Sequence, residues 1–146
     1  MQKKAFDSVS PSILKIKLDS YGFDQTSCNL LYSFMSNRSQ FVDKRGSHSA
    51  HRLVDYGVPQ GSLLGPTLFT LFFNDVCSLP FASRAHLYAD DTTLHISGPN
   101  LQTIAQELNN DLNTFKQCMV SNCLYINASK SEVVHIRPSR QSILLS

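Results

Sequence analysis

The sequence contains few cysteines, and none of them is placed for a metal site. Its 146 residues include four, at positions Cys28, Cys77, Cys118 and Cys123. No two of them form a C-x-x-C pair, and none lies near a histidine at a zinc-ligand spacing. We therefore expect reduced thiols buried in the core, as in an intracellular protein.

Long apolar segments are also missing. A membrane-spanning helix needs roughly 18 consecutive apolar residues, whereas the longest apolar stretch is interrupted by Gly65, Pro66 and Asn74. The first residues lack the hydrophobic region of a signal peptide. We therefore expect no membrane partner and an intracellular location, in the nucleus or the cytoplasm.

Charge is scarce as well. Only 16% of the residues are charged, and the formal net charge is +2. Such a small excess permits a polyanionic partner without arguing for one. The 42% apolar content is typical of a globular protein, so the chain is one domain or a part of one. Its oligomeric state is left open.

Apolar periodicity and capping residues predict helices over residues 11–22, 24–37, 64–77 and 100–120. Short strands are predicted over residues 38–45, 50–56, 85–97, 124–126 and 132–136. Because helices alternate with short hairpins, the expected fold class is α+β, with a small antiparallel sheet and helices packed on one face. Residues 138–146 are expected to form a loose tail.

Two adjacent acids, Asp90 and Asp91, lie where alternating strand residues on both sides predict a hairpin turn. Neighbouring carboxylates repel each other unless water or a cation compensates them. A solvated turn is the simpler interpretation, because Asp is common in turns. A divalent cation is the alternative, since Mg²⁺ is held by one or two carboxylates together with substrate phosphates.

Five stretches that occur in order favour the second interpretation. Their sequences are KAFDSV at 4–9, NRSQ at 37–40, GVPQGSLLGP at 57–66, YADD at 88–91 and LYINASKSE at 124–132. Together they resemble the palm of reverse transcriptases from non-LTR retrotransposons of the Jockey and CR1 kind. The resemblance implies that residues 1–137 are a partial reverse transcriptase domain, palm-like, with incomplete fingers and no thumb.

The resemblance implies RNA-directed DNA synthesis, in which a DNA primer is extended on an RNA template from deoxynucleoside triphosphates. Asp90 would be the main ligand of Mg²⁺, with Mn²⁺ as a possible substitute, and Asp91 a supporting ligand, for a two-metal phosphoryl transfer. Tyr88 would lie beside the primer terminus. Alternatively, its ring packs on a neighbour in the strand.

The same resemblance gives roles to five further positions. Phe6 would exclude a ribose 2′-hydroxyl, unless it is a core residue. Gln60 and Gly61 would bind the nucleotide, in a loop whose glycines permit close approach to sugar and phosphate. Lys130 would protonate the leaving pyrophosphate, or be an ordinary turn lysine. Arg38 would contact the nucleic-acid backbone, or join two strands.

One position departs from the family pattern. The family places a metal-binding Asp three residues before its Lys-Ala-Phe, and here that residue is Met1. We therefore expect a chain truncated at its start that does not polymerise by itself. The alternatives are a non-catalytic nucleic-acid-binding remnant and a functionless fragment of a decayed element.

Overall fold

The computed structural model describes residues 5–136 of the chain. Its α-helices are α1 Pro11–Ser20, α2 Gln25–Met35, α3 Gly65–Phe73 and α4 Leu101–Ser121. Its strands are β1 Arg38–Gln40, β2 Asp43–Lys44, β3 Ser47–His48, β4 Arg52–Val54, β5 Arg84–Tyr88 and β6 Asp91–His95. Short 3₁₀ turns complete it: η1 Ala5–Ser8, η2 Asn74–Ser78 and η3 Ala128–Lys130.

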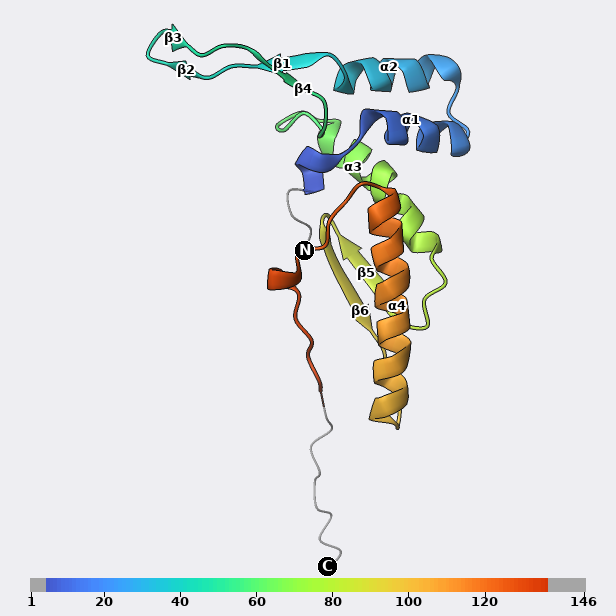
Figure 1. Ribbon diagram of the computed structural model, residues 1–146. Coiled ribbons are helices and arrows are strands. Elements are labelled where there is room, and N and C mark those ends of the chain that lie inside the picture. Colours follow the sequence, from blue (N-terminus) through green and yellow to red (C-terminus); the bar gives the residue numbers. More distant parts are fainter. Residues whose placement is uncertain (1–4, 137–146) are drawn as a thin grey trace, which may run out of the picture.

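The helices divide into a group of three and a separate fourth (Figure 1). α1 packs on both α2 and α3, and a narrow ribbon made of β1, β4, β2 and β3 projects from this group. The hairpin of β5 and β6 lies beside α4, the longest helix (Figure 1). The two acids, Asp90 and Asp91, belong to this hairpin.

A row of aromatic rings joins these parts. The ring of Phe6 stacks on Phe69 of α3 at a centroid distance of 4.2 Å, and Phe69 stacks on Phe73 at 5.7 Å. Phe73 in turn meets Phe115 of α4 edge-on at 6.4 Å. Such pairs contribute about 0.5–1.5 kcal/mol each beyond their burial. The row therefore holds η1, α3 and α4 in one core.

The helix starts that capping residues predict are confirmed. The Ser10 side chain accepts a hydrogen bond from the N–H of Ile13 at 3.4 Å, and Pro11 is the first helical residue. The Asp24 side chain accepts one from the N–H of Ser27 at 3.0 Å. Each bond satisfies an amide that the first turn of a helix leaves unpaired.

The mixed α and β content is confirmed, but the expected single sheet is not what residues 5–136 form. Their strands make three separate two-stranded antiparallel sheets. The predicted pair of strands over 124–126 and 132–136 is wrong, because the first segment has only an isolated bridge at Ile126 and residues 132–136 belong to no strand. The expected tail at 138–146 lies outside the described residues.

The third helix is shorter than its apolar pattern predicts. α3 ends at Phe73, and residues 74–78 continue as the 3₁₀ turn η2. Its 9 residues extend for about 13 Å, well short of a bilayer. Within residues 5–136, no helix combines the length and the apolarity that crossing a membrane requires.

The expectation of buried thiols is only partly met. Cys28 is buried in α2 and Cys118 is half-buried in α4, whereas Cys77 and Cys123 are exposed. Both exposed thiols lie where a helical segment ends, at η2 and just after α4, and the chain turns there at the surface. The expectation of buried thiols is therefore wrong for Cys77 and Cys123.

Gly57 is the point where two distant stretches of the chain meet. Its N–H donates to the Val9 carbonyl at 2.8 Å, and the N–H of Val58 donates to the Phe6 carbonyl at 2.9 Å. A Cβ at Gly57 would lie 2.8 Å from the Cα of Asp7, and the Gly57 φ is +86°. Only glycine fits this backbone, which brings the motifs at 4–9 and 57–66 together.

A pair of glycine substitutions tests this contact. Gly46, in the β2–β3 turn, also has a positive φ of +81° but nothing within 4 Å of its missing Cβ. Gly46→Ala should therefore lower the free energy of unfolding by about 1 kcal/mol. Gly57→Ala should lower it by a further 1–3 kcal/mol or so, because its Cβ clashes with backbone. Urea denaturation measures both, and equal losses would contradict the close approach.

Candidate functional site

The two acids lie at the turn of the β5–β6 hairpin. Tyr88 pairs with Asp91 across the strands, so Ala89 and Asp90 are the two turn residues. Ala89 has a φ of +51°, a left-handed conformation that two-residue hairpin turns require and that a non-glycine residue adopts at about 1–2 kcal/mol. The predicted strand, tight turn and strand are confirmed, but of the two acids only Asp90 is a turn residue, because Asp91 is the first residue of β6.

No described residue offsets the charge of these acids. Asp90 is half-buried and Asp91 is exposed. Between residues 5 and 136, no side chain or N–H donates a hydrogen bond to either carboxylate, and no cationic side chain forms a salt bridge with them. Two adjacent carboxylates without a partner need water or a cation.

The chemistry of this pair fits a hard divalent cation. One or two carboxylates, completed by substrate phosphates and water, are the usual protein ligands of Mg²⁺. Among residues 5–136, no three His, Cys, Asp or Glu side chains come together as a complete metal site. Asp90 and Asp91 are therefore candidate ligands for a cation that substrate also coordinates.

The hairpin has one face toward the core and one toward solvent. Exposure alternates along both strands, so that Leu87, Thr92 and Leu94 turn inward. On the open face the rings of His86 and His95 stack at 4.9 Å, and Tyr88 is 84% exposed. That exposure disfavours packing of Tyr88 on a neighbour, and its place beside a primer stays a prediction.

Residues 6, 7 and 60 form a second cluster, built where η1 meets the loop after β4. The Gln60 amide donates to the Asp7 carboxylate at 2.6 Å, while Gly61 has a positive φ of +78° and open space around it. The stacking of Phe6 on Phe69 favours its alternative role as a core residue, although its ring is only half-buried. Nucleotide contacts of these residues stay predictions.

Arg38 is engaged by the backbone. Its Nε donates to the Met35 carbonyl at 2.8 Å, and its Nη2 donates to the carbonyls of Tyr56 and Gly57. The guanidinium therefore links the end of α2 to the loop that follows β4. These bonds favour the structural alternative over a contact with nucleic acid.

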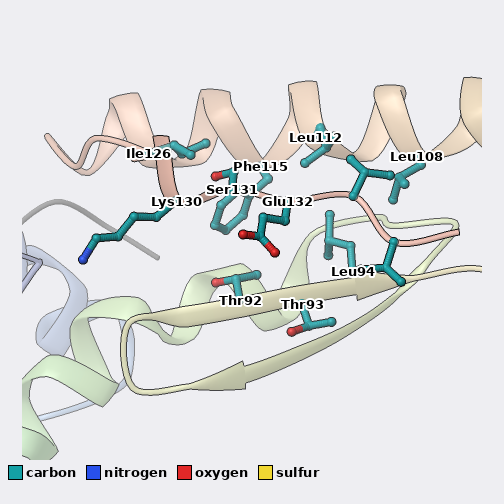
Figure 2. Close-up of a pocket in the computed structure, with 12 residues that line it drawn as sticks. Thr92, Thr93, Leu94, Leu108, Leu112, Phe115, Ile126, Lys130, Ser131 and Glu132 are labelled. Atoms are coloured by element: carbon teal, nitrogen blue, oxygen red, sulfur yellow. The ribbon is translucent and has the colours of Figure 1, made fainter. Parts of the chain in front are cut away.

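Lys130 lies in η3 and is exposed. Its side chain extends toward the end of the hairpin that carries the turn (Figure 2). It borders the space between β6 and the segment after η3. This position leaves both interpretations open, the general acid and the ordinary turn lysine.

The sequence reasoning missed a buried acid that positions the hairpin. Asp111 of α4 is 4% exposed, and its carboxylate accepts hydrogen bonds from the N–H groups of Ala82 and Ser83 at 3.0 and 2.7 Å. These two residues lead directly into β5. Burial alone would raise the pKa of Asp111, but the bonds from Ser83 and Ala82 outweigh it and hold that pKa below its usual value.

A signal for Asp111 does exist in the sequence. The positions Leu108, Asp111 and Phe115 follow helical spacing as well as Leu108, Leu112 and Phe115 do. Apolar periodicity assigns Leu112 to the buried face of this helix, yet Leu112 is 42% exposed. A buried acid at a core position signals a fixed hydrogen-bond partner.

A second polar cluster was also missed. Lys17 of α1 pairs with Asp75 of η2 at 2.9 Å, and the Asn122 amide after α4 donates to the same carboxylate oxygen at 3.0 Å. Burial, and then the charge of Asp75, raise the pKa of the neighbouring Cys118 thiol. The cluster ties the C-terminal end of α4 to the group of three helices.

Comparison with known proteins gives consistent matches. A family model described as reverse transcriptase (RNA-dependent DNA polymerase) matches residues 2–143. The RNA-directed DNA polymerase from mobile element jockey of Drosophila melanogaster is 30% identical over 67% of this chain and 12% of its own length. The probable RNA-directed DNA polymerase from transposon BS of the same species is 32% identical over 70% of this chain and 12% of its own.

A third relative, the RNA-directed DNA polymerase from mobile element jockey of Drosophila funebris, is 30% identical over 69% of this chain and 12% of its own length. The chain thus spans about an eighth of the relatives it matches. These matches confirm the resemblance that the ordered motifs indicate.

The role of Asp111 predicts a pH-dependent stability. Because its pKa is lower in the folded chain, its contribution is complete above the unfolded pKa, near 3.9, and is lost as pH falls through the folded value. Asp111→Asn should lower the free energy of unfolding by about 1–3 kcal/mol at neutral pH. The difference in the free energy of unfolding between Asp111→Asn and the unsubstituted chain should narrow as pH falls from roughly 5 to 3.

Denaturation at several pH values measures this gap. Asp55→Asn is the matched control, since Asp55 is exposed and should change stability little at any pH. If the stability difference between Asp111→Asn and the unsubstituted chain stays constant down to the lowest pH, the role of Asp111 is contradicted.

Proposed function

The chain belongs to the reverse transcriptase family, and from this premise we propose that it carries part of the active site of a retrotransposon RNA-directed DNA polymerase. The single observation that supports this most strongly is the pair Asp90 and Asp91 at a tight hairpin turn, to whose carboxylates no residue between 5 and 136 donates a hydrogen bond. Because the chain spans about an eighth of its relatives, the activity of the whole protein is part of the proposal.

Asp90 and Asp91 would hold Mg²⁺, or Mn²⁺ in its place. When bound, the metal supplies charge neutralisation at the phosphate and orients the attacking and leaving oxygens. The tight turn places the two acids next to each other before any ligand arrives, which lowers the entropy lost on binding. Tyr88 directly precedes the turn residues Ala89 and Asp90. Its exposed aromatic ring would support the end of a primer there.

Incoming deoxynucleoside triphosphate would bind beside the loop at 57–61. The Asp7–Gln60 bond supports this assignment, because it fixes the loop against η1 before substrate binds. Gly61 leaves room for a sugar or phosphate to approach the backbone. Arg38 acts here by positioning the loop through the carbonyls of Tyr56 and Gly57.

Two further groups complete the proposal. The ammonium group of Lys130 would donate a proton to the leaving pyrophosphate. Arg84, His86 and Tyr88 on the open face of the hairpin would lie along the primer and its RNA template, since cations and aromatic rings suit phosphates and bases. The roles of Lys130 and Tyr88 follow from the family, and those of Arg84 and His86 from the exposure of their side chains on the same face of the hairpin.

We expect the isolated chain to be inactive in primer extension with an RNA template, a DNA primer and Mg²⁺ or Mn²⁺. The physical reason is that Met1 occupies the position at which the family pattern has an acid. With one carboxylate fewer to hold the metal, the reaction would lose several kcal/mol of transition-state stabilisation. Template-dependent synthesis that disappears in Asp90→Asn would contradict this expectation.

A chimera tests the active-site assignment directly. Residues 5–136 would replace the matching segment of the jockey polymerase, whose own flanking segments are kept. We expect this chimera to extend a primer on RNA, and Asp90→Asn to lower its rate by about 100-fold or more. Asp55→Asn, an exposed acid after β4, should leave the rate unchanged. A chimera that is active and indifferent to Asp90→Asn would overturn the assignment.

A further inference from the structure

Positive charge is concentrated in the ribbon that projects from the group of three helices (Figure 1). Its residues 38–54 include four Lys or Arg but one Asp. The whole sequence has 13 Lys and Arg and 11 Asp and Glu, which leaves nine cations and ten acids for all other positions. With histidine neutral, the positive excess of the chain therefore lies in this ribbon.

Three of these cations have no partner among the described residues. Lys44, Arg45 and Arg52 are exposed, and no acceptor between positions 5 and 136 bonds to their side chains. The acid of the ribbon is engaged instead. The carboxylate of Asp43 accepts the N–H of Gly46 at 3.1 Å and lies 3.0 Å from a histidine ring nitrogen of β3. The cations are therefore available to a binding partner, and the acid is not.

Two of the available cations form the tip of the ribbon together with a serine. Lys44 ends β2 and Ser47 begins β3, and they are opposite each other as an antiparallel pair. Arg45 and Gly46 make the turn between them, with φ values of +53° and +81°. Positive φ at both central residues is typical of a tight hairpin turn. These four residues therefore occupy the outer end of the ribbon (Figure 1).

The hydroxyl of Ser47 is accessible. Ser47 is exposed, and its side chain forms no hydrogen bond with the part of the chain that the structure describes. The ladder of β2 and β3 has two residue pairs, and a short isolated ladder is marginally stable in water. The tip can therefore open locally, so that an enzyme cleft can hold it as an extended segment.

The order of residues at the tip occurs once in the sequence. Adjacent cations are found at Lys3-Lys4 and at Lys44-Arg45. Two positions after the first pair the residue is Phe6, and two positions after the second pair it is Ser47. Ser47 is thus the one hydroxyl residue with a cation at both the second and the third position before it. Protein kinases select substrates by charge patterns of this kind.

We propose that Ser47 is a phosphorylation site for a serine kinase that selects cations at the second and third positions before its acceptor. The Ser47 oxygen attacks the γ-phosphorus of ATP, and a new oxygen–phosphorus bond forms while the bond to ADP breaks. The hydroxyl proton passes to the catalytic aspartate of the kinase, and ADP leaves. Lys44 and Arg45 bind acidic side chains beside the cleft of the kinase.

The modification changes the charge of the ribbon. A phosphoserine carries about −1.5 to −2 charges at neutral pH, whereas residues 38–54 have four cations and one acid. Lys44 is the cross-strand partner of Ser47, at a spacing where opposite charges attract. The phosphate therefore weakens the attraction of the ribbon for polyanions. The site is separate from Asp90 and Asp91, so this proposal does not depend on polymerase activity.

A kinase assay on the whole chain tests the site. The probe is cAMP-dependent protein kinase, which selects adjacent cations before its acceptor, with ATP and Mg²⁺. We expect phosphate on Ser47, located by mass spectrometry of peptides, and none at this position in Ser47→Ala. The double substitution Lys44→Gln with Arg45→Gln should lower the initial rate at Ser47 at least about tenfold, because it removes both recognised charges.

Two variants of the same ribbon are matched controls. Ser39→Ala removes another exposed serine, which has no cation at the second or third position before it. Arg52→Gln removes another exposed cation, which lies outside the recognised spacing. Both should leave the rate at Ser47 unchanged. Because every substituted position is exposed, the fold should persist, and circular dichroism checks this for each variant.

Two results would overturn the proposal. The first is a whole chain that acquires no phosphate at Ser47. The second is phosphorylation of Ser47 at the same rate in the Lys44→Gln, Arg45→Gln variant and in the unsubstituted chain, since the two cations would then not be recognised.

Discussion

The geometry of the acidic turn depends on one buried carboxylate. Asp111 of α4 accepts the N–H groups of Ala82 and Ser83, so it fixes the point at which the chain enters β5. Charge-assisted bonds of this kind are stronger than neutral ones, and burial strengthens them further. Because the hairpin is short, a fixed entrance also fixes its turn, and with it Asp90 and Asp91.

From Asp111 the constraint extends to the rest of the fold. Phe115, one helical turn further along α4, meets Phe73 of α3, and the row of rings ends at Phe6 in η1. The cluster of Lys17 and Asp75 closes the other end of the same interface. The acidic turn and the loop at 57–61 are thus held by one connected set of contacts, as the proposed active site would require.

Features that depend on neighbouring residues were predictable from the sequence. The caps of α1 and α2 and the existence of the β5–β6 turn follow from local residue chemistry, although the turn lies one residue earlier than the two acids indicate. Asp111 was not predictable in its role, because its partners lie 28 and 29 residues away. The wrong strand pair at 124–126 and 132–136 has a similar cause. Alternating apolar and polar residues show that a segment is suited to a sheet, but they do not show which strand it pairs with.

The central claim is that Asp90 and Asp91 form a divalent-cation site, and Mn²⁺ broadening of amide NMR signals tests it most directly. Substoichiometric Mn²⁺ should broaden the signals of residues 88–92 first, and the double substitution Asp90→Asn with Asp91→Asn should abolish this. Asp43→Asn, in the distant ribbon, should leave it intact. Broadening that is centred elsewhere, or that survives the double substitution, would contradict the account.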